Sequence, residues 1–268
     1  MNTHNQEKKR RVSLQQAIIL FTLIFIVLVL TPVFYIQLRN VERVGEDKAH
    51  EQLGTEAEQV VVHVEEILQR SEKANQITAG EIKAGVVSHE TPDELQRLFL
   101  HLVKGYTEVS SMYFGNARGG LADAGFEPTD GSYYFIETED FLPGTFYKYV
   151  PGNPEETLDV VEDFDARTRP WYQNALEQDG VVWNDVYVLF TGQDMALSSS
   201  LAVFDEDENL LGVVGNDIFL AQLSDFLAEQ AARQGHLIFV MERNGSLIAS
   251  SDHRYHANGL GHVFIGNL

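Results

Sequence analysis

The sequence predicts an α+β protein with one N-terminal transmembrane helix, a long second helix and two antiparallel-sheet modules in series, the second incomplete. Three observations lead to this fold class. An apolar run lies near the N-terminus, and a proline-free stretch with helical periodicity follows it. The remaining chain then alternates short β-like stretches with turns rich in glycine, proline and asparagine. The 268 residues suffice for one large domain or two ordinary ones.

The apolar run is long enough to cross a membrane. Residues 17–36 read AIILFTLIFIVLVLTPVFYI, and no charged residue occurs from position 12 to position 38. Twenty such residues form a helix about 30 Å long, the thickness of the hydrocarbon layer. The alternative is a cleaved signal peptide, which has an apolar core of about 7–15 residues and a small-residue cleavage site. Residues 37–40 offer no such site, so we expect a retained single-pass anchor.

The distribution of charge orients this anchor. Residues 1–16 contain Glu7 as their only acid and the bases Lys8, Lys9, Arg10 and Arg11. The positive-inside rule therefore predicts a cytoplasmic tail over 1–16 and places the rest of the chain in the periplasm, outside the inner (cell) membrane. The whole chain has a net charge of −21, with 19 basic and 40 acidic residues, and no cysteine. Such acidity argues against a nucleic-acid partner, and the absence of cysteine excludes thiol chemistry.

The second helical segment, residues 37–79, carries an apolar stripe. Its residues recur at alternating steps of four and three: Leu53, Ala57, Val60, Val64, Ile67, Ser71 and Ala74. This spacing predicts one long helix that leaves the membrane. The stripe has two interpretations that the sequence leaves open. The helix packs on its own domain, or it forms a parallel homodimer through the heptad-like repeat.

The elements that follow are expected in a mixed order. A helix should begin at Thr91-Pro92, with Thr91 and Glu94 forming a capping box, and end near Lys104. Another short helix should cover residues 169–178, and a third should cover 219–233 and end before Gly235. The expected strands cover residues 109–115, 132–137, 145–150, 181–190, 195–204, 210–218, 236–242 and 246–250.

These elements predict two modules. The first should occupy residues 80–218, a connecting helix 219–235, and the beginning of the second module 236–268. A two-stranded hairpin is marginal on its own. We therefore expect the chain to be a truncated product or a fragment of a longer protein.

One short motif points to a known family. Residues 165–172 read DARTRPWY, Tyr187 follows, and residues 212–218 read GVVGNDI at the end of a predicted hairpin. This combination resembles the double Cache (dCache) family of extracytoplasmic sensor domains in bacterial transmembrane receptors, which include chemoreceptors, sensor kinases and diguanylate cyclases. The resemblance covers about residues 40–268. It implies two PAS-like modules, of which the membrane-distal one binds a small molecule for signal transduction across the membrane.

The resemblance also implies a set of ligand-binding residues. In the amino-acid-binding branch of the family, the pattern matches this sequence at Phe164, Arg169, Trp171, Tyr172, Tyr187 and Asp217. Two positions depart from the pattern. Phe164 stands where tyrosine is usual, and Leu189 stands where the pattern has an aspartate. The ligand is therefore expected to be an amino acid or a related carboxylate or amine.

The chemistry of these residues agrees with such a ligand. A guanidinium such as that of Arg169 binds a carboxylate through two hydrogen bonds, and Asp217 can accept hydrogen bonds from an ammonium group. The alternative is structural: Trp171 and Tyr172 fill the core, while Arg169 pairs with Asp163 or Asp165 on the surface.

Other chemistries have weaker support. Residues 205–209 resemble the start of a calcium loop, but the glycine and glutamate that such a loop needs at its sixth and twelfth positions are absent. His253, His256 and His262 lie in an expected loop without a helical register, which makes a preformed metal site unfavourable. We expect no metal, no cofactor and no catalytic residues, hence no enzyme. Two rival functions stay open. One is an anchored interaction protein without a small ligand, and the other is an extracellular hydrolase that uses Asp163, Asp165 or Asp185.

Overall fold

The computed structural model describes residues 13–127, 130–189, 195–242 and 245–255 of the chain. These residues fall into two compact units, which divide after Val61. Helix α1, Leu14–Lys83, contributes to both units.

The first unit consists of the N-terminal part of α1. Within it, residues Ile18–Val41 form the one described stretch that is long and apolar enough to cross a membrane. Its large side chains, such as Phe21 and Leu28, are exposed and not packed in a core. Such exposure is expected for apolar side chains that face lipid. The sequence predicted two consecutive helices over 17–36 and 37–79, whereas α1 is continuous and includes Pro32. A proline inside a helix removes one backbone hydrogen bond, and such prolines are tolerated in membrane-spanning helices.

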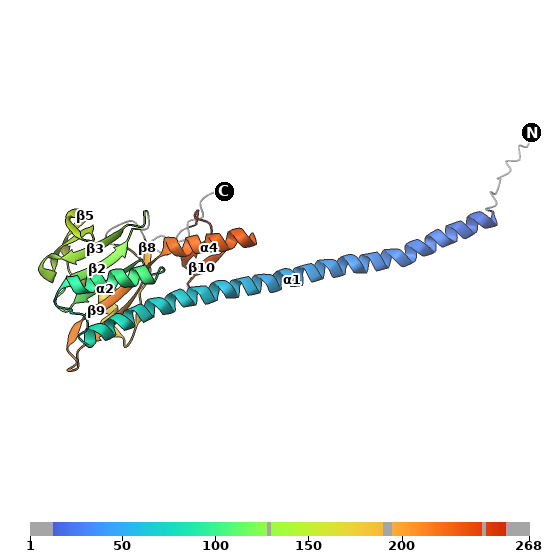
Figure 1. Ribbon diagram of the computed structural model, residues 1–268. Helices are drawn as coiled ribbons and strands as arrows, with labels where there is room; N and C mark the ends of the chain where they lie inside the picture. The colour runs from blue at the N-terminus through green and yellow to red at the C-terminus, as the bar shows by residue number, and fades with distance from the viewer. Residues whose placement is uncertain (1–12, 128–129, 190–194, 243–244, 256–268) are drawn as a thin grey trace, which may run out of the picture. The chain divides into compact units, whose positions relative to one another are not determined.

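The second unit contains one antiparallel sheet of nine strands with helices on both faces (Figure 1). The sheet order is β5-β4-β3-β2-β1-β9-β8-β6, and β7 pairs with β8. The strands are β1 (Ser111–Asn116), β2 (Leu121–Phe126), β3 (Tyr133–Thr138), β4 (Gly144–Val150), β5 (Asn153–Phe164), β6 (Val182–Trp183), β7 (Tyr187–Val188), β8 (Met195–Phe204) and β9 (Leu210–Phe219). The helices are the end of α1, α2 (Pro92–Gly105), η1 (Glu139–Phe141), η2 (Ala166–Thr168), α3 (Pro170–Glu177) and α4 (Leu220–Gln234).

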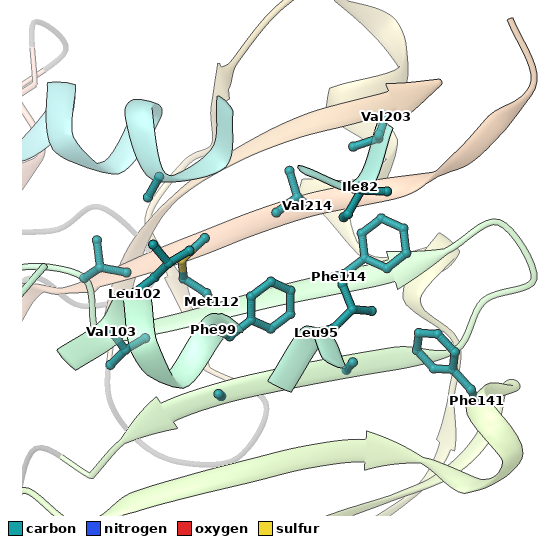
Figure 2. Packing of buried hydrophobic residues seen from close by; sticks show 14 residues of the cluster. Ile82, Leu95, Phe99, Leu102, Val103, Met112, Phe114, Phe141, Val203 and Val214 are labelled. Carbon is teal, nitrogen blue, oxygen red and sulfur yellow. The ribbon is translucent and has the colours of Figure 1, made fainter. Parts of the chain in front are cut away.

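One face of this sheet is covered by α2 and by the end of α1. Leu95 and Phe99 of α2 pack with Met112 and Phe114 of β1 in a fully buried cluster that also includes Ile82 of α1 (Figure 2). Burial of each such large side chain contributes about 1.5–3 kcal/mol. This face forms the main core of the module.

The opposite face of the sheet is covered by η2 and α3. Side chains alternate between the two faces of a strand, so Tyr113 points away from Met112 and Phe114. It packs with Trp171 and Tyr172 of α3 in a second buried cluster. The functional site described below lies on this face.

The start of α2 differs in detail from the prediction. The helix expected at Thr91 does begin at Pro92, but Thr91 makes no side-chain capping hydrogen bond. Glu94 instead accepts a hydrogen bond from the backbone N–H of Ser88 at 2.9 Å. The predicted capping box is therefore wrong, because the preceding loop supplies another donor.

The apolar stripe of α1 is partly used within the module. Ile67, Ser71 and Ala74 are buried, at 8%, 0% and 0% exposure. Packing on the helix's own domain is thus the correct interpretation for this part of the stripe. Dimerisation through the stripe stays a prediction.

Two strands were not predicted. β2 and β5 both lie in regions that the sequence analysis left without structure. β5 forms one edge of the sheet, is 12 residues long, and is exposed along most of its length. The predicted strand over 181–190 is interrupted and appears as the short strands β6 and β7, and residue 190 lies outside the described residues.

Beyond the sheet, α4 ends at Gly235, which adopts a left-handed conformation with φ of 76°. The strands β10 (Phe239–Met241) and β11 (Leu247–Ser250) then pair as an antiparallel hairpin, as predicted. Residues 256–268 lie outside the described residues, and so do His256 and His262.

Candidate functional site

A cavity lies between the sheet and the segment formed by η2 and α3. Its volume is about 60 Å³ in this structure, which is smaller than a preformed small-molecule site, so side chains of the wall would have to move to admit a ligand. Polar groups and apolar groups both contribute to its walls. The lining residues are Ser111, Tyr113, Leu121, Asp123, Tyr134, Ile136, Phe146, Phe164, Arg169, Trp171, Tyr187, Leu189 and Asp217.

The structure brings together most of the residues predicted for a ligand site. Five of the six line this cavity: Phe164, Arg169, Trp171, Tyr187 and Asp217. Leu189, the departure from the family pattern, lines it as well. These residues come from five different elements or loops, so only the folded sheet brings them into one place. That they contact a ligand stays a prediction.

Tyr172, the sixth predicted residue, is not among those that line the cavity. It is 2% exposed, and its hydroxyl donates a hydrogen bond to the backbone oxygen of Asn116 at 3.3 Å. Burial raises the pKa of its hydroxyl to about 12. In this structure Tyr172 connects α3 to the end of β1.

Asp217 is surrounded by hydroxyl groups. Tyr187 and Tyr113 donate hydrogen bonds to its Oδ1 at 2.9 and 3.1 Å, and Ser111 donates one to Oδ2 at 3.1 Å. The side chain is buried, and this burial raises its pKa to about 6 although the three hydroxyls oppose the shift. A buried acid in a cavity whose pKa is raised by burial is a candidate functional group.

Asp123 is a second buried acid in the same cavity. It lies on β2, is 7% exposed, and its Oδ1 has no hydrogen-bond partner within the described part of the chain. Burial, followed by the charge of Asp217, raises its pKa well above the ordinary value, while Lys148 opposes the shift. The sequence analysis missed Asp123 because it did not predict β2.

Two glycines make room for the aromatic walls of the cavity. A Cβ on Gly215 would lie 2.4 Å from the ring of Tyr113, and a Cβ on Gly125 would lie 2.4 Å from the hydroxyl of Tyr134. Both rings are therefore placed over positions where any other residue would collide with them. The two tyrosines can lie flat against neighbouring strands only because these glycines have no side chain.

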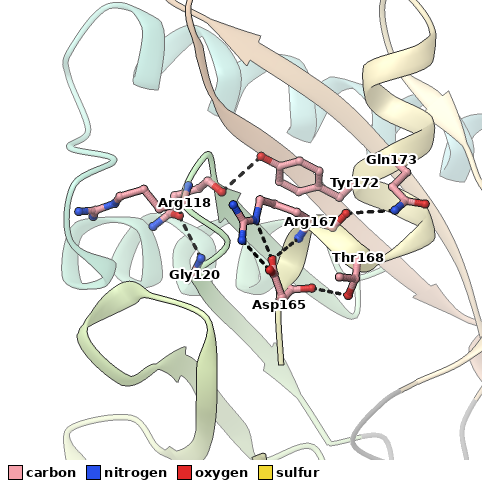
Figure 3. A network of polar contacts seen from close by, with 8 residues as sticks. Arg118, Gly120, Asp165, Arg167, Thr168, Tyr172 and Gln173 are labelled. Atoms are coloured by element: carbon pink, nitrogen blue, oxygen red, sulfur yellow. Dashed lines mark hydrogen bonds and ion pairs between the residues drawn. The ribbon is translucent and has the colours of Figure 1, made fainter. Parts of the chain in front are cut away.

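The turn that carries Arg169 is held by its own hydrogen bonds (Figure 3). Asp165 accepts hydrogen bonds from the backbone N–H of Arg167 at 2.9 Å and from its guanidinium at 3.0 and 2.7 Å. Asp165 thus pairs with Arg167 rather than with Arg169, contrary to the structural alternative. Pro170 then begins α3, so Arg169 is fixed at the junction between η2 and α3.

Trp171 completes the wall above the sheet. Its ring lies 4.7 Å from that of Tyr113, centroid to centroid, and its backbone oxygen accepts a hydrogen bond from Ser200 at 2.8 Å. Phe164 packs edge-on against Phe146 with centroids 5.2 Å apart. These contacts give the cavity an apolar wall next to its charged groups.

The acids required by the hydrolase alternative do not converge. Asp163 and Asp185 are exposed, and Asp165 is paired with Arg167. None of these three lines the cavity. The described residues also contain no group of three metal-ligating side chains.

Comparisons with known proteins agree with the geometry. Residues 125–225 match the family described as "Methyl-accepting chemotaxis protein-like, first PDC sensor domain". The chain is 32% identical over 92 residues to the methyl-accepting chemotaxis protein McpC of Bacillus subtilis (strain 168), a match that covers 34% of this chain and 14% of McpC. The matched segment thus spans a small part of that relative.

Solved structures share the fold. The ligand-binding domain of the Campylobacter jejuni chemoreceptor Tlp3, in complex with 4-methylisoleucine, matches with a TM-score of 0.51 at 14% identity, covering 73% of this chain and 66% of that one. The ligand-binding domain of the Pseudomonas aeruginosa PAO1 amino acid chemoreceptor PctC, in complex with GABA, matches with a TM-score of 0.51 at 19% identity, covering 74% and 73%. These matches support the predicted resemblance: residues 125–225 match a chemoreceptor sensor-domain family, and the module shares the fold of solved chemoreceptor ligand-binding domains.

Proposed function

We propose that this sensor module binds a small molecule with a carboxylate and an ammonium group, an amino acid or a close relative, in the cavity beneath Trp171. The observation that carries the proposal is that Arg169 and Asp217 line the same cavity. A guanidinium and a carboxylate in one pocket match the two charged groups of an amino acid. The apolar side chains of the same lining suit a carbon chain.

The occupants of similar structures support this ligand class. The Tlp3 domain was solved with 4-methylisoleucine and the PctC domain with GABA. Both ligands carry one carboxylate and one amino group. At 14% and 19% identity these likenesses concern the fold, so the ligand proposal depends on the residues of this cavity.

We further propose that ligand binding is transmitted across the inner (cell) membrane as part of a longer receptor. The N-terminal tail would lie in the cytoplasm and the sensor module in the periplasm, because the basic cluster precedes the apolar span. A small displacement of α1 would carry the signal. A homodimer through the N-terminal half of the stripe would be the assembled form.

The test is a binding screen with the full chain in detergent or lipid nanodiscs. Thermal shift and calorimetry would be measured against amino acids, amines and carboxylates. At least one amino acid should raise the melting temperature, and Arg169→Ala should abolish that shift because the carboxylate loses its partner. Arg97→Ala, on the exposed face of α2, is the matched control and should leave the shift unchanged. Unchanged affinity in Arg169→Ala would contradict the proposal.

A further inference from the structure

The cavity holds two buried acids that differ in their surroundings. Asp217 already accepts three hydrogen bonds from Ser111, Tyr113 and Tyr187. Asp123 lines the same cavity, yet its Oδ1 accepts no hydrogen bond within the described residues. A buried carboxylate oxygen without a partner is unfavourable, so a ligand donor that reaches it should bind more tightly.

The two acids lie on different strands of the sheet. Asp123 on β2 lies opposite Tyr113 of β1, and Asp217 on β9 lies opposite Ser111 of β1. Strand β1 therefore stands between them, and they are also offset by two residues along it, so their backbones are about 12 Å apart. An ammonium nitrogen reaches acceptors at about 2.8 Å. The two carboxylates thus offer two places for cationic groups rather than one.

Among the described residues that line the cavity, two are acids and one is a base. The acids are Asp123 and Asp217, and the base is Arg169. Lys148 lies on the same face of the sheet, but its ammonium group forms an ion pair with Glu127. Burial raises the pKa of both acids, and a ligand cation beside each carboxylate would favour its ionised form. A ligand with one negative and two positive charges would therefore match Arg169 and the two acids.

We infer that the ligand is an amino acid with a basic side chain, such as lysine or ornithine, whose α-ammonium binds Asp217 and whose side-chain cation binds Asp123. This inference depends on the proposed amino-acid site and names its ligand class. Asp123 is then the residue that determines specificity. Arg169 binds the carboxylate of the ligand, whether this is lysine or ornithine.

The test compares ligands matched in length. L-lysine is compared with L-norleucine, and L-ornithine with L-norvaline, by calorimetry on the full chain in nanodiscs. The basic member of each pair should bind about tenfold more tightly or better, because norleucine and norvaline leave Asp123 without a partner. Asp123→Asn should remove this preference and leave the affinity for norleucine unchanged or improved. Asp185→Asn, an exposed acid that does not line the cavity, is the matched control and should keep the preference.

The outcomes separate this inference from the proposed function. Equal affinities of lysine and norleucine, or an unchanged ratio in Asp123→Asn, would overturn the role of Asp123 while the amino-acid site stands. Binding of neither member of either pair, together with no hit in the wider screen, would overturn the proposed function and the inference with it. Circular dichroism of each variant shows whether it is folded, and Asp123→Leu provides a second neutral variant with the same expected loss of preference.

Discussion

Asn216 of β9 and Ser71 of α1 exchange two hydrogen bonds across a buried interface. Ser71 Oγ donates to Asn216 Oδ1 at 2.5 Å, and Asn216 Nδ2 donates to the backbone oxygen of Ser71 at 2.9 Å. Asn216 is the neighbour of Asp217, and the two side chains point to opposite faces of the sheet. A strand that touches the ligand cavity on one face is therefore tied to α1 on the other.

Removing this connection should destabilise the module. Asn216→Ala removes the acceptor shared by the hydroxyls of Ser71 and Ser199, and the donor to the backbone oxygen of Ser71, in a fully buried site. The free energy of unfolding should therefore fall by about 2–3 kcal/mol. Urea denaturation measures the change. Asn153→Ala on the exposed start of β5 is the control, with an expected change below about 0.5 kcal/mol. Equal effects of the two substitutions would contradict the structural importance of the connection.

The pH dependence of stability should report the buried Asp217. Its pKa is raised to about 6 in the folded state, so its contribution to stability is fully present below about pH 4 and is lost as the pH rises through about 6. The loss amounts to roughly 3 kcal/mol at neutral pH without ligand. The difference in unfolding free energy between the wild type and Asp217→Asn should shrink or reverse between pH 4.5 and 7. The same measurement on Asp185→Asn should give a constant difference.

Ligand affinity should follow the same titration in the opposite direction. A cationic group binds the ionised form of Asp217, so affinity should decrease as the pH falls below about 6. Calorimetry between pH 5 and 8 measures it, and Asp217→Asn should bind weakly with little dependence on pH over that range. Affinity that stays constant from pH 5 to 8 in the wild type would speak against an ammonium contact at Asp217.

A pair of tyrosine substitutions distinguishes the cavity from the core. Tyr187→Phe removes a donor to Asp217 and should weaken ligand binding about threefold to tenfold. Tyr172→Phe removes a hydroxyl that bonds the backbone of Asn116 outside the cavity lining, so affinity should stay the same. A larger loss of affinity in Tyr172→Phe would restore Tyr172 to the binding site.

The glycine beneath Tyr113 should tolerate no side chain. Gly215→Ala places a Cβ against the Tyr113 ring, which must move into the cavity, so both stability and ligand affinity should fall. Gly80→Ala is the control, because nothing lies within 4 Å of its Cβ position in helix α1. That substitution should be neutral or should stabilise by up to about 1 kcal/mol.

The predicted membrane orientation can be tested by single introduced cysteines, because the chain has none of its own. A membrane-impermeant maleimide added to intact spheroplasts should label Ser132→Cys in the sensor module. It should label Asn2→Cys only after the membrane is permeabilised. The reverse pattern of labelling would show that the positive-inside rule fails for this chain.

Much of the fold could be predicted from the sequence, because several strands have a clear apolar pattern. β8 and β9 match the prediction almost residue by residue. β2 was not predicted because Ala122, Ala124 and Gly125 are small and give no hydrophobic alternation. β5 was not predicted because it is an exposed, acidic edge strand with Pro154 near its start, and such a sequence is also typical of a loop.

Prediction of the candidate site from the sequence has the same limit. Arg169, Trp171, Tyr187 and Asp217 were predicted from a motif, and the fold brings them to one cavity. Asp123 could not be placed with them, because its position depends on the pairing of β2 with β1. A hydrophobic pattern normally specifies the register of a strand, and the sequence of β2 lacks one.

The exposed edge strand β5 has a consequence for how the protein behaves at high concentration. An open edge offers unpaired backbone groups that could recruit a strand from a neighbouring molecule and start aggregation. Its solvent-exposed positions include Glu155, Glu156 and Glu162, and two such edges placed side by side would bring like charges together. Part of the net charge of −21 therefore acts as protection against self-association, at the strand where the sheet is most vulnerable to it.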